Sequence, residues 1–221
     1  MVPPLALDID GTLTDGTGRI DSRAFELLPE WDAPIVLATG KAFPYPVALC
    51  HFLGIHERVV AENGGVVYAD DTLRFTADRE RVDDAIAAFV DRGGDLGWGP
   101  ADTVNRWRET EVAVRLDADE TLLRAVAAEF DLEVIDSGYA YHLKLPDVEK
   151  GDGLVTVASI LGYDPDEFLA IGDSENDVST FAVAGDSFAV GNADDRARAA
   201  ADTVLERSYF EGTLSVLERF L

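Results

Sequence analysis

An apolar segment that ends in two closely spaced carboxylates constrains this chain more than any other part of its sequence. Residues 5–7 are apolar and are followed by Asp8, Ile9, Asp10 and Gly11. The apolar run predicts a buried strand, and the carboxyl end of such a strand is where open α/β sheets bind ligands. A turn at Gly11 would let Asp8 and Asp10 approach one point, where their charges repel unless a cation or a proton lies between them. The stretch therefore indicates an acidic, metal-assisted site, although a strand before an ordinary Asp-Gly turn would have the same residues.

Short apolar segments alternate with helical patterns near both ends of the chain. The predicted parallel strands are 5–8, 35–38, 59–61, 168–171, 187–190 and 203–204. This alternation predicts an α/β fold, with a Rossmann-like, doubly wound parallel sheet covered by helices on both faces. Residues 66–68 and 73–75 have the pattern of a hairpin that turns at Asp70-Asp71.

Residues 78–148 have a different pattern, which indicates an inserted domain. The predicted elements are a helix at 79–91, strands at 104–107 and 111–116, a helix at 120–130, and strands at 132–135 and 139–145. This α-β-β-α-β-β order predicts a small α+β cap with an open-faced sheet and two helices. The cap would be inserted into a core made of residues 1–77 and 149–221.

Polar residues follow several of the predicted parallel strands, so the fold would gather them at one edge of the sheet. They are Asp8, Asp10, Thr39, Gly40, Lys150, Asp173 and Asp177. Together such groups could transfer a phosphoryl group through an aspartyl-phosphate. Asp8 would be the nucleophile, and Asp10 would protonate the leaving group and then activate water.

The remaining groups suit the metal and the phosphate. Asp8, Asp10, Asp173 and Asp177 would supply oxygen ligands to Mg²⁺, with Asp10 able to use its main-chain carbonyl. The Thr39 hydroxyl, the Gly40 N–H group and the Lys150 ammonium would hold phosphate oxygens. Taken singly, each group has a plainer explanation, such as a strand end, a surface lysine or an acidic helix cap.

These motifs resemble those of the haloacid dehalogenase (HAD) superfamily of phosphatases. The segments that carry the resemblance are 8–14, Thr39, 62–65, Lys150 and 172–177. The turn at 62–65 is similar to one in the branch whose cap lies between the second and third motifs. The resemblance implies a HAD-like core, Mg²⁺ as the cofactor, and a phosphate site that includes Asn176. Lys41 departs from the pattern, because relatives often carry Arg there, and Lys cannot make the bidentate contacts of Arg.

The small cap is similar to that of archaeal-type phosphoglycolate phosphatases within this branch. The resemblance implies hydrolysis of 2-phosphoglycolate to glycolate and phosphate. Sugar-phosphate phosphatases of the sucrose-phosphate or mannosylphosphoglycerate type are an alternative, and a phospho-accepting, receiver-like signalling domain is an alternative of another class. A carboxylate substrate would require a cationic partner in the cap, and the candidates are Lys144, Arg106, Arg108 and Arg115, with His142 as a further donor.

The charge of the chain limits its partners and its surroundings. There are 43 acidic and 18 basic residues, which give a net charge of −25. This excess of acid excludes nucleic-acid binding through a basic surface. The apolar content of 47% argues against disorder. A folded, acid-coated protein is typical of adaptation to high salt, where the Debye length is about 3 Å at ~1 M, although an ordinary acidic protein is the plainer alternative.

The sequence contains no apolar run as long as a membrane span and no recognisable signal peptide. We therefore expect a cytoplasmic protein. The resemblance implies an enzyme of carbohydrate metabolism that acts on a small phosphorylated metabolite. The single cysteine, Cys50, excludes an internal disulfide framework. A monomer and a homodimer are both compatible with the sequence.

Overall fold

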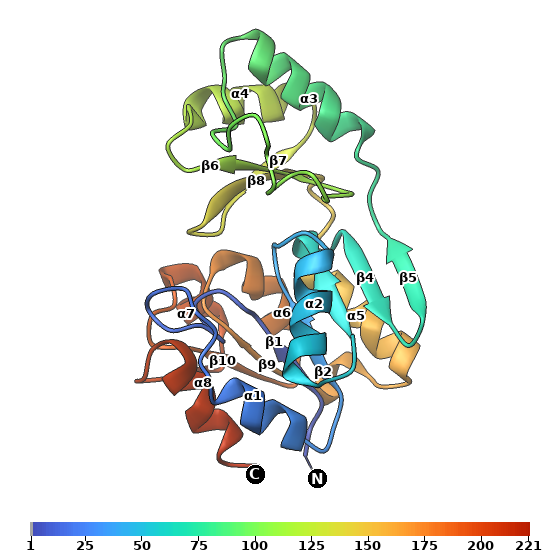
Figure 1. Ribbon diagram of the computed structural model, residues 1–221, viewed down its shortest axis with the longest axis vertical. Coiled ribbons are helices and arrows are strands. Elements are labelled where there is room, and N and C mark those ends of the chain that lie inside the picture. Colours follow the sequence, from blue (N-terminus) through green and yellow to red (C-terminus); the bar gives the residue numbers. More distant parts are fainter. Residues whose placement is uncertain (1) are drawn as a thin grey trace.

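The computed structural model describes residues 2–221 and has a larger lower part and a smaller upper part (Figure 1). The larger part contains an eight-stranded sheet. In spatial order its strands are β11 (Thr203–Val204), β10 (Asp186–Ala189), β9 (Leu169–Gly172), β1 (Leu5–Leu7), β2 (Ile35–Ala38), β3 (Val59–Ala61), β4 (Val66–Ala69) and β5 (Thr72–Phe75). The first six run parallel, and β4 and β5 form an antiparallel edge. The predicted doubly wound α/β core is confirmed.

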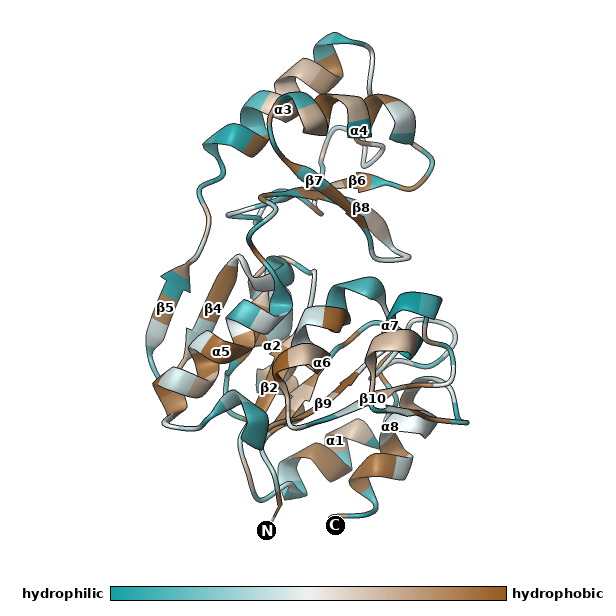
Figure 2. Cartoon of the chain, turned by 180° about the vertical axis from the view of Figure 1, so that it is seen from behind, coloured by the Kyte–Doolittle hydropathy of each residue, from teal (hydrophilic) through white to brown (hydrophobic). Residues whose placement is uncertain are grey.

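Helices cover both faces of this sheet. One face packs against α1 (Ala24–Leu27), α2 (Pro44–Leu53) and α8 (Tyr209–Leu217). The other face packs against α5 (Lys150–Leu161), α6 (Val178–Val183) and α7 (Asp195–Ala200). Side chains of β1 alternate between these layers, because Leu5 and Leu7 join the first apolar cluster and Ala6 joins the second. Figure 2 shows the apolar strands enclosed between the two layers.

The smaller part has its own sheet and its own apolar core. Its elements are α3 (Glu80–Asp91), β6 (Val112–Arg115), α4 (Glu120–Glu129), β7 (Glu133–Asp136) and β8 (Ala140–Lys144). The antiparallel sheet, in the order β6-β8-β7, carries both helices on its outer face and turns its other face toward the larger part (Figure 1). We call residues 78–148 the cap; their status as a separate domain remains a prediction.

The two faces of β8 differ in character. Tyr141 and Leu143 pack with the apolar residues of α3 and α4. His142 and Lys144 alternate with them and are also buried, on the face turned toward the larger part. Polar side chains of the cap are therefore presented to the carboxyl ends of the core strands.

The prediction of a strand at 104–107 is wrong. These residues form turns, and the observed order of the cap is α-β-α-β-β. The Asn105 side chain accepts a hydrogen bond from the N–H group of Ala113 and donates one to its carbonyl oxygen. A side-chain amide thus occupies the two backbone groups through which Ala113 would otherwise pair with a neighbouring strand.

The predicted hairpin at the edge of the core is confirmed. It joins β4 to β5, and both turn residues, Asp70 and Asp71, have positive φ angles of 45° and 59°. Two such angles in succession are typical of the tight hairpin turns whose twist matches that of the strands. No helix within residues 2–221 is long and apolar enough to cross a membrane.

Helix α5 lies unusually close to its neighbours, and this proximity places Lys150 at the strand ends. A Cβ atom on Gly153 would overlap Val60 of β3, and one on Gly151 would overlap the carbonyl of Ser179 in α6. The facing strand residues are small as well, since Ala6, Ala38 and Ala170 line this side of the sheet. Close packing of this kind leaves little space for an added methyl group.

We expect Gly153→Ala to lower the free energy of unfolding by about 1–2 kcal/mol, because overpacking of a tight core outweighs the helix propensity that Ala gains. Urea unfolding at constant KCl concentration measures the change. Ser159→Ala, at an exposed position of the same helix, is the matched control and should alter stability by less than ~0.5 kcal/mol. Equal stability of the two variants would show that this contact does not limit packing.

Candidate active site

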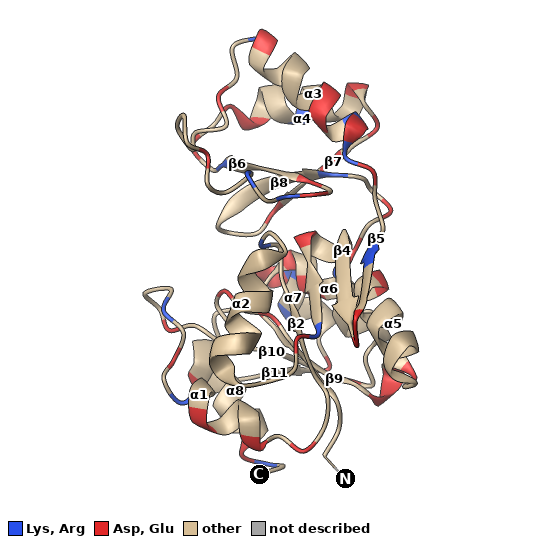
Figure 3. Ribbon diagram, turned by 45° about the vertical axis from the view of Figure 1, so that its right-hand side comes forward, with Lys and Arg blue, Asp and Glu red and all other residues tan. Residues whose placement is uncertain are grey.

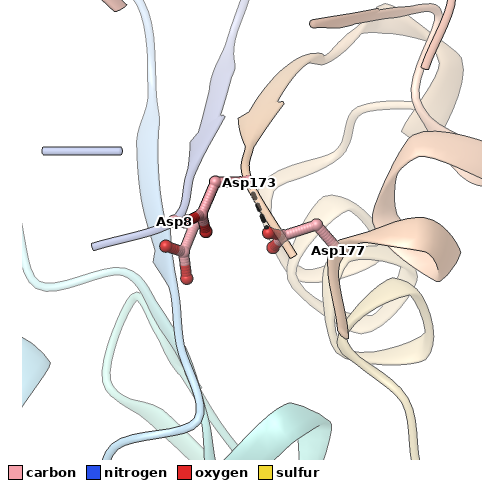
Figure 4. Close-up of side chains that lie close together, drawn as sticks. All are labelled: Asp8, Asp173 and Asp177. Carbon is pink, nitrogen blue, oxygen red and sulfur yellow. Dashed lines mark hydrogen bonds between the residues drawn. The ribbon is translucent and has the colours of Figure 1, made fainter. Parts of the chain in front are cut away.

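Three carboxylates converge at the carboxyl ends of β1 and β9 (Figure 4). Asp8 directly follows β1, Asp173 directly follows β9, and Asp177 lies one turn further along the chain. The two strands are parallel neighbours, so the residues that follow them meet at one edge. Each of the three residues offers an oxygen that lies within 4.8 Å of the others. Gly11 makes this approach possible, because a Cβ atom at that position would overlap the Asp173 carboxylate.

The ammonium group of Lys150 lies between two of these carboxylates, those of Asp8 and Asp177. Its Nζ atom lies 2.8 Å from Oδ1 of Asp8 and 2.8 Å from Oδ1 of Asp177, and the residue is 1% exposed. The second oxygen of Asp177 accepts hydrogen bonds from the N–H groups of Asp173 and Ser174. Oδ2 of Asp8 is buried and has no partner among residues 2–221. Oδ2 of Asp173 accepts a hydrogen bond of 3.2 Å from the Asn192 side chain, so the uncommitted oxygens of the cluster are Oδ2 of Asp8 and Oδ1 of Asp173.

The electrostatics of the cluster favour an added cation. Burial raises the pKa of Asp8 to about 7, although Lys150 acts in the opposite direction. Burial, followed by the charges of Asp8 and Asp177, raises the pKa of Asp173 to about 9. Burial alone would lower the pKa of Lys150, but Asp177 and Asp8 raise it, so the ammonium stays charged. An unpartnered carboxylate oxygen within an all-oxygen donor set fits Mg²⁺, which prefers such ligands.

Asp10 lies beside this cluster and faces the cleft. Its Oδ2 atom is 2.8 Å from Nζ of Lys41, and its side chain is 45% exposed. Lys41 also lies over the ring of Tyr139 in the cap, with Nζ 4.9 Å from the ring centroid. Lys41, which stands where relatives often carry Arg, thus contacts Asp10, the proposed acid, through a single ammonium group.

A cavity of about 30 Å³ lies over Asp8 and Asp10 and is enclosed by both parts of the chain. Its core lining is Asp8, Asp10, Thr39, Gly40, Lys41, Ser174 and Asn176, and its cap lining is Arg108, Ser137, Tyr139 and His142. The structure therefore brings all the residues predicted for the site to one region. Lys150, Asp173 and Asp177 lie behind the cavity, in contact with Asp8 or next to it.

The cap rests on the turn at 62–65. Oε2 of Glu62 accepts hydrogen bonds from the N–H groups of Glu109 and Thr110, at 2.9 and 2.8 Å. Asn63 donates to Oε2 of Glu111 in the cap and accepts from the Asn176 side chain, at 2.8 and 2.9 Å. A continuous chain of buried amides and carboxylates thus joins the cap to the loop that follows β9.

Glu111 is a site residue that sequence reasoning missed. It is fully buried, contacts the Arg108 guanidinium, and accepts a hydrogen bond of 2.6 Å from Nδ1 of His142. Burial would raise the pKa of Glu111, but His142 and Arg108 lower it to about 2. No signal in the sequence distinguishes this glutamate from the many surface acids around it, because its partners are brought to it only by the fold.

The structure separates the five candidate donors of the cap into two groups. Arg108 and His142 reach the cavity. Lys144 pairs with Glu133, Arg115 pairs with Asp117, and Arg106 lies over the ring of Trp107.

The chain matches the family model of haloacid dehalogenase-like hydrolases over residues 5–103 and 114–217, and it belongs to that family. A phosphoglycolate phosphatase of Halorubrum lacusprofundi is 66% identical over 219 residues, which cover 98% of this chain and 96% of the relative. A protein of the same name from Halobacterium salinarum is 52% identical over 217 residues, with 98% and 96% covered.

Solved structures have the same fold. A Thermoplasma acidophilum protein superimposes with a TM-score of 0.87 at 27% identity, covering 100% of this chain and 98% of that one. A haloacid dehalogenase-like hydrolase from Bacteroides thetaiotaomicron gives a TM-score of 0.80 at 21% identity, with both chains covered completely.

The raised pKa values predict how Mg²⁺ binding depends on pH. The pKa values of Asp8 and Asp173 rise from 3.8 to about 7 and about 9 on folding, so the metal-free protein retains protons that the unfolded chain has lost. The metal-free fold therefore loses stability as the pH rises from about 4 to 9. Mg²⁺ replaces these protons, so we expect the rise in Tm on adding Mg²⁺ to be larger at pH 8 than at pH 5.

Differential scanning fluorimetry at constant KCl, with EDTA or Mg²⁺, measures this rise. At ~100 times Kd it should reach roughly 5–10 °C. Asp173→Asn should abolish most of the effect, while Asp32→Asn, at an exposed and distant position, should preserve it. The same rise in Tm at both pH values, or in both variants, would contradict a metal site at this cluster.

Proposed function

We propose that this protein is a Mg²⁺-dependent phosphatase that hydrolyses 2-phosphoglycolate through an aspartyl-phosphate. The observation that carries the proposal is the state of Asp8. One of its oxygens is held by Lys150, and the other is buried without a partner beside Asp173. A carboxylate held in one orientation in this way is suited to in-line attack on phosphorus.

The side chains around Asp8 have distinct roles in this proposal. Asp8 attacks the phosphoryl group, and Asp10 gives a proton to the leaving oxygen. Asp10 then removes a proton from the water that hydrolyses the aspartyl-phosphate. The exposed side of Asp10 toward the cleft suits a group that must meet first an alcohol and then water.

The phosphate would be held by donors of the core. Oγ1 of Thr39 accepts a hydrogen bond from the Lys41 N–H group, so its hydroxyl proton remains available for a phosphate oxygen. Gly40 and Asn176 line the same cavity, where the Gly40 N–H group would be the donor. Lys150 adds a buried positive charge behind the nucleophile.

Mg²⁺ would be held by Asp8 and Asp173, with Asp177 and the main-chain carbonyl of Asp10 as the other predicted ligands. When bound, it would neutralise charge on the phosphoryl oxygens and on the acids around them. Asp177 has a second role, because it positions Lys150 and the loop after β9 through the bonds described above.

The proposed substrate rests on the relatives and on the cavity. Relatives that are 66% and 52% identical over nearly the whole chain are named phosphoglycolate phosphatases. The cap residues Arg108, Tyr139 and His142 line the same cavity as Asp8 and Asp10, which favours a small leaving group over the larger one of a sugar phosphate. Because these residues cover the site, we infer that the cap moves away for substrate to enter. The receiver-like alternative is not favoured, because the chain belongs to a hydrolase family and the cap covers its acid.

We expect Asp8→Asn to reduce kcat for 2-phosphoglycolate on the order of 10⁴-fold or more, because the variant has no nucleophile. Phosphate release assays in KCl with Mg²⁺ measure this loss, and a cooperative melting transition in EDTA would show that the variant is folded. Substantial turnover by Asp8→Asn would exclude the proposed mechanism.

The Asp10→Asn variant distinguishes the two chemical steps. With p-nitrophenyl phosphate, whose leaving group requires no proton, the aspartyl-phosphate should form and accumulate. Rapid-quench trapping should detect an initial burst of p-nitrophenolate that is followed by slow turnover. A normal steady state in this variant would rule out Asp10 as the acid and base.

The acidic surface leads us to propose that the protein is adapted to high salt in the cytoplasm. Acidic side chains are spread over the helices of the core and the cap (Figure 3), and the net charge is −25. Their repulsion is screened as the Debye length falls from about 10 Å at 0.1 M salt to about 3 Å at 1 M. We therefore expect Tm to rise between 0.1 and 1 M KCl. Sucrose provides a control without screening, and a constant Tm across this range of KCl would contradict the proposal.

A further inference from the structure

We propose that Arg108 of the cap binds the carboxylate of the substrate through the edge formed by its Nε and Nη2 atoms. The inference rests on the proposed function, and it assigns a specificity-determining residue to the same site. The carboxylate is the group that distinguishes 2-phosphoglycolate from a phosphate ester whose alkyl group is uncharged.

One edge of the Arg108 guanidinium is committed to the protein and the other is free. Nη1 donates to the carbonyl oxygen of Gly40 at 2.8 Å and contacts Glu111. Nε is buried without a hydrogen-bond partner, and no residue within 2–221 accepts a hydrogen bond from Nη2. The residue is 5% exposed and lines the cavity over Asp8. A buried, charged donor without a partner is costly unless a ligand supplies the acceptor.

The free edge has the geometry of a carboxylate site. Nε and Nη2 present two parallel N–H groups, which match the two oxygens of a carboxylate. Glu111 and the Gly40 carbonyl hold the guanidinium on its other side, so little side-chain freedom is lost when the ligand binds.

Arg108 enters the cavity from the cap, whereas the proposed phosphate donors Thr39, Gly40 and Lys150 belong to the core. Arg108 meets the core at the Gly40 carbonyl through Nη1, which leaves its Nε and Nη2 edge uncommitted. It also borders a second cavity of about 50 Å³, which shares Lys41 and Tyr139 with the first. A substrate whose phosphate contacts Asp8 would extend its other end toward the cap.

Two permanently cationic side chains within residues 2–221 line the cavity, and both are paired with an acid. Arg108 contacts Glu111 through Nη1 and keeps Nε and Nη2 uncommitted, whereas Lys41 contacts Asp10 with its single ammonium group.

The test compares two substrates that differ only at the proposed contact. They are 2-phosphoglycolate and 2-hydroxyethyl phosphate, in which a hydroxymethyl group replaces the carboxylate. In Arg108→Gln, we expect kcat/KM for 2-phosphoglycolate to fall about 10- to 100-fold, as for loss of a charged hydrogen bond. The value for 2-hydroxyethyl phosphate should change little. Arg108→Lys, which retains the charge without the bidentate edge, should fall between wild type and Arg108→Gln.

Arg106→Gln is the matched control, because Arg106 is an exposed arginine of the same loop and does not line the cavity. It should leave the ratio of the two kcat/KM values unchanged. An equal loss for both substrates in Arg108→Gln and Arg108→Lys would overturn the inference, since Arg108 would then serve the phosphate or the fold. Unchanged kcat/KM values for both substrates in both variants would also overturn it, while leaving the proposed function intact. Failure of the wild-type enzyme to hydrolyse either ester would overturn the proposed function together with the inference.

Discussion

The ammonium group of Lys150, buried between Asp8 and Asp177, is the interaction on which the rest of the structure depends. Taking three charges out of water is expensive, and the cost is offset only by close and well-directed contacts. Three separate parts of the chain must therefore meet within hydrogen-bonding distance: the end of β1, the start of α5 and the loop after β9. The small residues of α5 and of the strands beneath it are explained by this requirement. A bulkier helix would stand further from the sheet and withdraw the ammonium from its partners.

The core and its acidic cluster could be predicted from the sequence because the signals are local. The strand that ends in Asp8 and Asp10 can be recognised from its own residues. Strands that alternate with helices restrict the topology to a few arrangements. The rule that ligands bind at the carboxyl ends of parallel strands then brings Thr39, Lys150 and Asp173 together without any knowledge of side-chain contacts.

The parts that could not be predicted depend on contacts across the fold. Glu111 is one acid among 43 in the sequence, and only the meeting of cap and core gives it Asn63 as a partner. The five candidate donors of the cap could not be ranked, since their order depends on which side of β6, of β8 or of the 104–111 loop each occupies. The wrongly predicted strand at 104–107 has a related cause. Val104 and Trp107 are residue types that favour strands, but Asn105 makes with its amide the bonds that a backbone would have made.

The alternation of side chains along β8 has a consequence for how this enzyme can move and diversify. Its apolar side chains belong to the interior of the cap, while His142 and Lys144 are turned toward the core. Movement of the cap away from the core would therefore expose a polar face of β8 to water and leave the apolar core of the cap buried. Each opening would expose little apolar surface for nonspecific contacts. The same separation allows the polar face of β8 to change independently of the apolar core of the cap. Substitutions on this face can alter substrate specificity without disturbing the packing that keeps the cap folded.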